Sequence, residues 1–309
     1  MKILMTGSTG LVGTAFVNKL AHEGHTVCRL LRPQTKSPAG IKGGIDVVWN
    51  PSTFGVVSGR SELGGAGVGA EAVVNLAGAS IADGRWSDER KKLLRTSRIY
   101  TTRALVNALA KMSARPAVLV SASAIGIYGS RGDELLTEDS APGTDFLSSL
   151  AREWEAEAMK AEALGIRVVL ARFGIILSRN GGALPKMMLP FQFGAGGKLG
   201  SGKQWMSWVT IEDVVGILKF APENSAVRGA VNVVAPGAVQ NAEFTKVLAK
   251  VMRRPAIFPA PAFALRLALG EMADALLLSS QRVMPKKLQQ LGYFFLHSEL
   301  PAALNAVLA

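Results

Sequence analysis

The sequence has very few of the residues that form disulfides and metal sites. Among its 309 residues it holds one cysteine, Cys28, and three scattered histidines, His22, His25 and His297. One cysteine cannot form a disulfide within a single chain, and isolated histidines do not provide a metal-binding cluster. We therefore expect no metal centre, and the cysteine count fits a reducing, cytoplasmic compartment.

Long hydrophobic runs are also missing. No uncharged apolar stretch reaches the roughly 18 residues that a membrane-spanning helix needs. The apolar start at residues 2–6 passes directly into a glycine-rich loop, so we expect a buried strand there and not a signal peptide. With 49% hydrophobic and 19% charged residues, the chain has the composition of a packed globular protein.

Acidic residues are in the minority. The chain has 23 Asp and Glu against 35 Lys and Arg, which gives a formal net charge of +12. Such a balance suits nucleic acid, an anionic cofactor or a phosphate-bearing substrate. Because no nucleic-acid-binding motif accompanies the charge, we predict a small-molecule substrate, with the charge favouring an anionic one, and no specific nucleic acid.

Apolar runs of strand length alternate with helical patterns along most of the chain. The runs fall at residues 2–7, 26–31, 46–50, 72–78, 117–123, 167–174 and 231–236. Between them, residues 14–24 and 89–111 show the apolar spacing of helices. This alternation predicts an α/β fold, a Rossmann-like doubly wound parallel sheet covered by helices on both faces.

Two segments depart from this repeat. Residues 178–208 are rich in glycine and are predicted to form a substrate-side loop. From residue 241 the chain reads as helices interrupted by proline-containing segments. We predict a Rossmann-like domain over residues 1–240 and a small, mainly helical, substrate-side lobe over residues 241–309.

The segment GSTGLVG, after the first predicted strand, carries glycines at positions 7, 10 and 13. In a dinucleotide-binding loop the first glycine allows the tight turn, the second lets the backbone approach a pyrophosphate, and the third packs the helix on the sheet. The N-terminus of the following helix attracts phosphate. We predict cofactor contacts along the whole segment, which comprises Gly7, Ser8, Thr9, Gly10, Leu11, Val12 and Gly13.

The end of the second predicted strand indicates which dinucleotide binds. An NAD site places Asp or Glu about 20 residues beyond the glycine loop, where it binds the ribose hydroxyls. Between Glu23 and Asp46 the sequence has no acidic residue, and it offers Arg29 and Arg32 instead. Arg32 falls just beyond the strand, where an adenosine 2′-phosphate would lie, whereas Arg29 lies inside it and can simply line a face. The pattern favours NADP(H).

The run NLAG ends the fourth predicted strand with small residues that allow a cofactor to pass closely. We therefore include Leu76, Ala77 and Gly78 in the predicted cofactor site. The next helix carries Arg95 and Arg98 on one face. These arginines either contact the cofactor or form a solvated basic face, and Arg98 is the better cofactor candidate.

These motifs resemble the extended and atypical short-chain dehydrogenase/reductases. More closely, the chain is similar to the epimerase-like relatives of the NAD-dependent epimerase/dehydratases that carry a C-terminal domain of unassigned role. The resemblance covers nearly the whole chain and includes TGSTGLVG, SASAIGIYG, WEAEA, RFGIILSRNGGAL, GGKLGSGKQWMSWVTIEDV and MPKKLQQLGY. It implies a Rossmann-like NADP-binding fold and does not indicate a substrate.

The superfamily transfers hydride with the help of a tyrosine and a lysine four residues later. The lysine lowers the pKa of the phenol, which then exchanges a proton with the substrate oxygen. The chain has three tyrosines, and none of them has a lysine at that spacing. The resemblance places Phe146 and Leu150 where the pair would stand, and neither side chain can exchange a proton.

Two hydroxyl groups remain near the expected nicotinamide position. The resemblance places Ser123 near the superfamily's substrate-binding serine, with Ala124 as a rival alignment, and Tyr128 follows in the next loop. We predict Ser123 and Tyr128 as the catalytic residues, with Arg131 as a neighbour able to lower the phenol pKa. The alternative is that Ser123 bonds to the backbone and Tyr128 packs. Asp133 and Glu138 are further candidate bases.

The sixth predicted strand should end beside the nicotinamide, so we predict that Gly174 and Ile176 contact the cofactor. Farther along, Lys198, Lys203 and Gln204 stand among glycines and suit an anionic substrate group, unless this region is an ordinary surface loop.

The sequence thus predicts an NADP(H)-dependent oxidoreductase or nucleotide-sugar-epimerase-like enzyme. The alternative is a catalytically weak protein that senses NADP(H) and regulates a partner. The missing Tyr/Lys pair favours the alternative, and the predicted pocket favours the enzyme.

Overall fold

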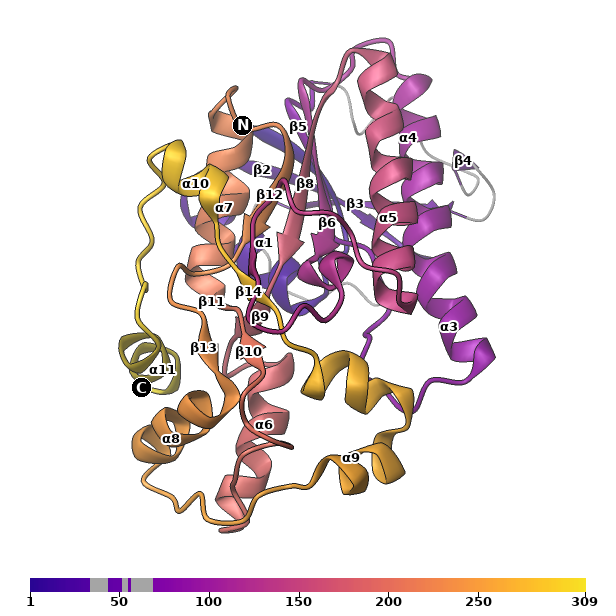
Figure 1. Ribbon diagram of the computed structural model, residues 1–309. Helices are drawn as coiled ribbons and strands as arrows, with labels where there is room; N and C mark the ends of the chain where they lie inside the picture. Colours follow the sequence, from indigo (N-terminus) through magenta and orange to yellow (C-terminus); the bar gives the residue numbers. More distant parts are fainter. Residues whose placement is uncertain (34–43, 52–54, 57–68) are drawn as a thin grey trace.

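The computed structural model describes residues 1–33, 44–51, 55–56 and 69–309 of the chain. Figure 1 shows a central sheet with helices on both sides and a second group of helices below it. In the described part of the chain, no helix is long and apolar enough to cross a membrane.

The central sheet contains seven parallel strands, as the alternating pattern predicts. They are ordered β12-β8-β6-β5-β1-β2-β3, and the short β4 (Gly55–Val56) pairs antiparallel to β3 at the edge. The order reverses between β1 and β5, and in such sheets ligands bind outside the carboxyl ends of the strands at this point. The parallel strands are β1 (Lys2–Thr6), β2 (Thr26–Leu31), β3 (Gly44–Asn50), β5 (Ala72–Asn75), β6 (Val118–Ala124), β8 (Arg167–Phe173) and β12 (Gly229–Val233).

Alternate residues of each strand face opposite helical layers. Ile3 and Met5 of β1 join the core beneath α1 (Leu11–His22) and α7 (Ile211–Glu223), whereas Leu4 joins the core beneath the other layer. That second layer consists of α3 (Asp88–Arg95), the π-helical turn η2 (Thr96–Tyr100), α4 (Thr101–Ala110), α5 (Phe146–Met159) and the short 3-10 turn η4 (Lys160–Leu164). Burial on both faces explains why the strands read as continuous apolar runs.

A second core lies beyond the carboxyl ends of the strands. It is built around Leu184, Phe191 and Trp208, together with residues of α8 and α11. The contributing elements are β9 (Ile175–Leu177), α6 (Ala183–Gln192), β10 (Trp205–Met206), β11 (Trp208–Thr210), β13 (Val239–Gln240), α8 (Asn241–Met252) and α11 (Leu300–Leu308).

The prediction of a loop over residues 178–208 is wrong for residues 183–192, which form the helix α6. Leu184 and Phe191 lie two helical turns apart and are both buried, and this apolar face stabilises the helix despite Pro190 inside it. Glycines on both sides of α6 concealed the helical pattern, since they dominate the composition of the segment.

The last part of the chain returns to the sheet. After α9 (Ala262–Leu269) and η5 (Ala273–Leu278), β14 (Arg282–Val283) pairs with β7 (Leu135–Leu136), which follows the 3-10 turn η3 (Ile125–Tyr128). The helix α10 (Lys286–Gln290) contacts β12. The division at residue 240 stays a prediction, and residues 241–309 contribute to both the second core and the sheet region.

Candidate functional site

The glycine loop between β1 and α1 has little room for side chains. Gly7 has a φ of +69°, and a Cβ there would lie 2.4 Å from the carbonyl oxygen of Leu76. A Cβ on Gly13 would lie 2.1 Å from the carbonyl oxygen of Gly7, since the helix packs directly on the turn. Both glycines are therefore required by the fold itself.

Gly10 is different, because the chain leaves space at this residue. Among the described residues a Cβ there would meet only the carbonyl oxygen of Gly7, at an ordinary 3.5 Å, and Gly10 caps α1 without any side-chain hydrogen bond. The hydroxyl of Ser8 is buried and has no hydrogen-bond partner among the described residues. An open cradle, an unpartnered hydroxyl and a helix N-terminus together fit a pyrophosphate group.

The two arginines at β2 have separate environments. Arg29 is buried, and its guanidinium forms an ion pair with Asp46 of β3, with Nη2 2.6 Å from Oδ1. Arg29 therefore has a structural role, because its charge is paired within the sheet. Arg32 follows β2 directly and is exposed. Its side chain is available to a ligand at the strand end.

A buried polar network supports the end of β5 from below. The side-chain amide of Asn75 donates to the hydroxyls of Thr102 and Ser121, at 2.9 and 3.0 Å, and its carbonyl oxygen accepts from Thr6 at 2.7 Å. Asn75 therefore links β1, β5, β6 and α4 directly beneath residues 76–78. Asn75 was not among the site residues predicted from the sequence, although a polar residue at the end of an apolar strand was a usable signal.

Arg98 is hydrogen-bonded to the loop that follows β5. It lies in η2, and its Nη2 donates to the carbonyl oxygen of Ala79 at 3.0 Å, while the N–H of Ala79 donates to Ser97 at 3.0 Å. Gly78 lets the guanidinium approach, since a Cβ there would lie 3.2 Å from Cζ of Arg98. Arg95 instead pairs with the exposed Glu153. π-helical turns within α-helices are frequent at functional sites.

The charge of Arg98 is fixed at neutral pH. Burial, with a smaller contribution from Arg90, lowers the pKa of Arg98 to about 10, so its guanidinium stays protonated. The same group lies 5.3 Å from the ring centroid of Trp154 in α5. The arrangement offers a positive charge beside residues 76–79, and cofactor contact by Arg98 stays a prediction.

Ser123, at the end of β6, belongs to a buried ionic network. Its hydroxyl donates to Oε1 of Glu155 at 2.6 Å, and the same carboxylate receives two hydrogen bonds from Arg172 of β8, at 2.8 and 2.9 Å. Burial alone would lower the pKa of Arg172, but the hydrogen bonds and charge of Glu155 raise it. The acidic side chain of α5 thus points inward to meet a buried cation.

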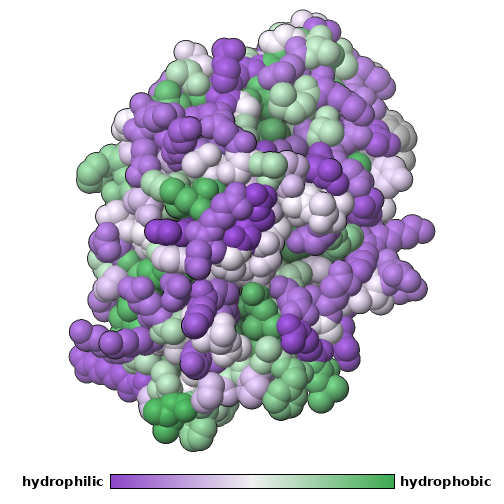
Figure 2. Space-filling view, in the orientation of Figure 1, coloured by the Kyte–Doolittle hydropathy of each residue, from purple (hydrophilic) through white to green (hydrophobic). Residues whose placement is uncertain are grey.

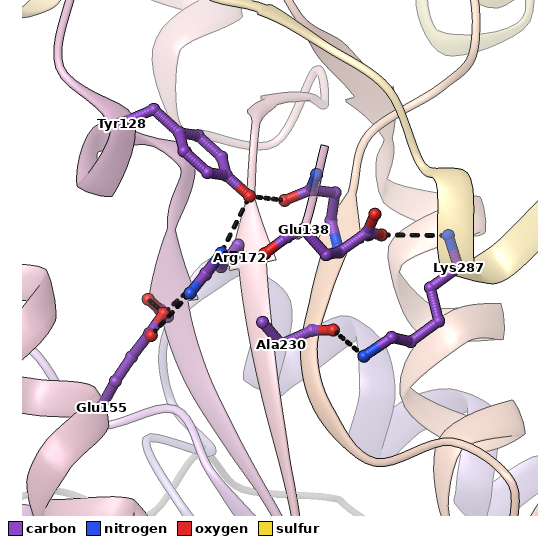
Figure 3. A network of polar contacts seen from close by, with 8 residues as sticks. Tyr128, Glu138, Glu155, Arg172, Ala230 and Lys287 are labelled. Atoms are coloured by element: carbon purple, nitrogen blue, oxygen red, sulfur yellow. Dashed lines mark hydrogen bonds and ion pairs between the residues drawn. The ribbon is translucent and has the colours of Figure 1, made fainter. Parts of the chain in front are cut away.

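Tyr128 joins the same network and is completely buried. Its hydroxyl donates to the side-chain oxygen of Asn232 at 2.7 Å and accepts from Nη1 of Arg172 at 2.9 Å (Figure 3). Burial raises the pKa of Tyr128, although the Arg172 charge opposes the shift. Glu138 extends the network, because its Oε1 accepts from the backbone N–H groups of Asn232 and Lys287.

These contacts favour the packing alternative for Tyr128. The catalytic roles of Ser123 and Tyr128 stay predictions. Of the other candidates, Arg131 pairs with Glu134, at 2.7 Å, and Asp133 accepts from the indole of Trp205. None of these groups is aimed at Tyr128 as a free cation or base.

The positions of the missing Tyr/Lys pair are apolar in space as well as in sequence. Leu150 is buried with Leu94 and Ile99, and Phe146 packs edge-on against Trp86, with ring centroids 5.3 Å apart. The first turn of α5 therefore presents an aromatic surface where the superfamily has a phenol.

The segment after β8 reaches back over the glycine loop. A Cβ on Gly174 would lie 2.6 Å from the carbonyl oxygen of Ser207, so packing explains this glycine. Ile176 is half-buried on β9, and a Cβ on Gly182 would lie 3.1 Å from Leu11 at the start of α1. Cofactor contacts by Gly174 and Ile176 stay predictions.

The predicted anion-binding residues of the glycine-rich segment are divided between the surface and the interior. Lys198 and Lys203 are exposed, whereas Gln204 is buried and donates to two backbone carbonyl oxygens. A surface groove of about 760 Å³ lies elsewhere, along α8 and α11, and includes none of the predicted site residues. Within the described residues, no three His, Cys, Asp or Glu side chains gather as a metal site.

Comparison with known proteins agrees with this architecture. Residues 3–234 match the model of the NAD dependent epimerase/dehydratase family, and residues 260–307 match a domain of unknown function, DUF1731. Epimerase family protein YfhF of Bacillus subtilis is 40% identical over 310 residues, covering 100% of this chain and 98% of the relative. The chloroplastic SDR39U1 homolog of Arabidopsis thaliana is 38% identical, covering 100% and 87%.

Solved structures show the same similarity. The crystal structure of human epimerase family protein SDR39U1 (isoform2) with NADPH superposes with a TM-score of 0.85, at 32% identity and 99% coverage of both chains. UDP-glucuronic acid 4-epimerase from Bacillus cereus, in complex with UDP-glucuronic acid and NAD, has a TM-score of 0.76 at 16% identity, which shows the fold alone. The chain belongs to the NAD dependent epimerase/dehydratase family and carries the additional DUF1731 domain.

Proposed function

We propose that the chain binds NADP(H) and uses it as an oxidoreductase or epimerase-like enzyme on a small-molecule substrate. The observation that carries this proposal is Arg32, an exposed cation directly after β2. An NAD site would place a carboxylate there, but Asp46, which pairs with β2 from the neighbouring strand β3, is already held by Arg29. The NADPH in the human SDR39U1 structure supports the same choice.

The chain's residues divide the work of binding. Ser8 and the first turn of α1 hold the pyrophosphate, Arg32 pairs with the 2′-phosphate, and Arg98 fixes the loop beside the nicotinamide half. When bound, the cofactor supplies or accepts a hydride. Ser123 is better placed than Tyr128 to handle a substrate proton, because its hydroxyl is bonded directly to the Glu155 carboxylate.

A second candidate is a protein that senses NADP(H) and regulates a partner. The observation favouring it is that Phe146 and Leu150 replace the proton-exchanging pair, while the hydroxyls of Ser123 and Tyr128 are both engaged inside the protein. Such a chain would bind the cofactor tightly and turn over little.

The test is a titration of the protein with NADPH and NADH. We expect NADPH to bind more tightly, and Arg32→Ala to remove roughly a ten- to hundredfold preference, because a charge-assisted phosphate contact contributes about 1.5–3 kcal/mol. Arg254→Ala, which removes an exposed arginine beyond α8, is the matched control. Unchanged selectivity in Arg32→Ala would overturn the proposal. A screen of carbonyl compounds with NADPH then separates the enzyme from the sensor.

A further inference from the structure

Three segments far apart in the sequence form a ring beside the carboxyl end of the sheet. They are residues 79–91, 183–200 and 256–271, which we call the apolar frame. Figure 1 shows α6 and α9 as its two arms, with the chain that leads from α8 to α9 passing the lower end of α6. There the backbone of Phe258 donates to Gly196 at 3.0 Å and that of Ala260 donates to Lys198 at 2.9 Å.

The loop after β5 closes the other two corners of the apolar frame. Lys186 of α6 donates to the carbonyl oxygen of Ala82 at 3.0 Å. On the opposite side, Lys91 of α3 pairs with Glu271, just beyond α9, at 2.5 Å. This loop begins at Ala79, whose carbonyl oxygen accepts a hydrogen bond from Arg98, so the apolar frame adjoins the predicted cofactor site.

Exposed hydrophobic side chains concentrate on the two arms and on the chain next to them. Among the described residues, six of the thirteen large hydrophobic residues that are exposed belong to the apolar frame. No residue of α9 is buried. Figure 2 shows hydrophobic surface over the lower ends of α6 and α9. The six are Leu189, Phe193, Ile257, Phe258, Phe263 and Leu267, each more than half exposed.

The helical spacing turns the α6 side chains toward the loop. Lys186 and Leu189 are three residues apart and share one side of α6, and Phe193, the residue that ends the helix, follows four residues after Leu189. Because Lys186 reaches the loop at Ala82, the two apolar residues lie on the side that faces the ring.

The same reasoning applies to α9. Phe263 and Leu267 are four residues apart, and Gly270 continues their side of the helix. A Cβ on Gly270 would lie 3.2 Å from the guanidinium of Arg85, which belongs to the loop. Arg266, three residues after Phe263 and four before Gly270, lies on this side as well, and its guanidinium pairs with Asp274 of η5 at 2.9 Å.

Near α3, the apolar frame combines an aromatic surface with a hydrogen-bond donor that has no partner among the described residues. Phe146 packs there against Trp86, and the Lys91 ammonium lies 5.1 Å from the ring centroid of Phe146. The Nε atom of Arg90 is buried and has no hydrogen-bond partner in the part of the chain that the structure describes. A ligand oxygen would satisfy this donor while the apolar remainder extends between α6 and α9.

We infer that the apolar frame is the substrate entrance and takes a carbonyl compound carrying a long apolar chain or ring system. This inference rests on the proposed function, because it assigns the substrate class of the same site. Nucleotide sugars, which some fold neighbours bind, need many hydrogen-bonding partners. Three of the six Lys and Arg residues in the apolar frame, Lys91, Lys186 and Arg266, are already paired with acidic residues, and its two arms are mainly apolar.

The experiment measures the affinity of 1-alkanols of four to ten carbons from their displacement of anilinonaphthalene sulfonate from the protein, with and without saturating NADPH. Affinity should rise roughly threefold to fourfold for each added methylene, the value for burying that group. Phe263→Ser and Leu267→Ser should each weaken 1-decanol binding at least tenfold. Phe294→Ser, which removes an equally exposed ring outside the apolar frame, should match the wild type.

Several outcomes would overturn the inference. One is an affinity that does not depend on the length of the alkanol chain, and another is an equal loss of 1-decanol affinity in Phe294→Ser. A third is a dimer, measured by light scattering, that Phe263→Ser converts to monomers. A fourth is binding to phosphatidylglycerol vesicles that Phe263→Ser abolishes. NADPH titration of each variant keeps the two proposals separate: if the wild type binds no NADPH, the proposed function fails, while the alkanol series without NADPH still tests the apolar frame.

Discussion

Glu155 of α5 and Arg172 of β8 form a two-point ion pair beneath both predicted catalytic hydroxyls. Nε and Nη2 of the arginine lie 2.8 and 2.9 Å from the two carboxylate oxygens, and each side chain is only 10% exposed. The pair explains why Ser123 and Tyr128 are so firmly placed, since each donates to it or accepts from it.

Removing one member of this pair should be costly. Arg172→Met leaves the Glu155 carboxylate buried without its cation, so we expect the free energy of unfolding to fall by about 3–5 kcal/mol. Arg95→Met breaks the exposed pair with Glu153 and should cost less than about 1 kcal/mol. Urea denaturation of both variants provides the measurement, and equal losses would show that burial does not strengthen the Arg172 interaction.

Tyr128→Phe separates packing from catalysis. The variant leaves Asn232 without its donor, so we expect a loss of about 1–3 kcal/mol in the free energy of unfolding and unchanged NADPH affinity. If Tyr128 acted as the proton donor predicted from the sequence, turnover on any identified substrate would fall about 10²–10⁴-fold. A variant of wild-type stability with such a loss in turnover would establish the catalytic role.

The sheet could be predicted because its physical signal is local. Each of the seven apolar runs becomes a parallel strand, and the alternation of residues such as Ile3 and Leu4 between two cores follows from strand geometry. The same holds for Gly7 and Gly13, whose steric roles follow from a tight turn between a strand and a helix.

The polar interior could not be predicted in the same way. Glu155 and Arg172 are 17 residues apart, and nothing in either local pattern shows that both point into one buried space. The helix α6 was missed because proline and glycine dominate its segment, while its stability comes from contacts of Phe191 with residues of distant elements. Tertiary packing decides such cases.

Glu23 should make the protein sensitive to acid. Its hydrogen bonds with Lys19 of α1 and Lys219 of α7 lower its pKa from 4.5 to about 2. Because the folded pKa is the lower one, this stabilisation is fully present above pH 4.5 and is lost as the pH falls toward 2. After allowance for solvent screening, we expect Glu23→Gln to cost about 1 kcal/mol at pH 6.

The measurement is thermal or urea unfolding of wild type and Glu23→Gln between pH 2 and 7. The difference between them should shrink as the pH falls. Glu223→Gln is the control, since its carboxylate lies 3.9 Å from Lys219 and is 44% exposed. A constant difference across the whole range would contradict the ion-pair explanation.

Gly10→Val should separate cofactor binding from folding. Gly10 has an extended backbone, with φ −77° and ψ 173°, that other residues adopt easily, and the protein leaves space for a Cβ. A branched side chain there would occupy the place of the pyrophosphate. We expect unchanged circular dichroism and at least a hundredfold loss of NADPH affinity, measured by the fluorescence of bound NADPH.

Gly13→Val makes the matched comparison within the same loop. Its Cβ would lie 2.1 Å from the carbonyl oxygen of Gly7, so the helix must move away from the turn and the fold itself should be destabilised. We therefore expect opposite results from the two variants: Gly10→Val folds but does not bind NADPH, whereas Gly13→Val does not fold stably. Normal NADPH binding by Gly10→Val would mean that this loop is a structural turn and that the phosphates bind elsewhere.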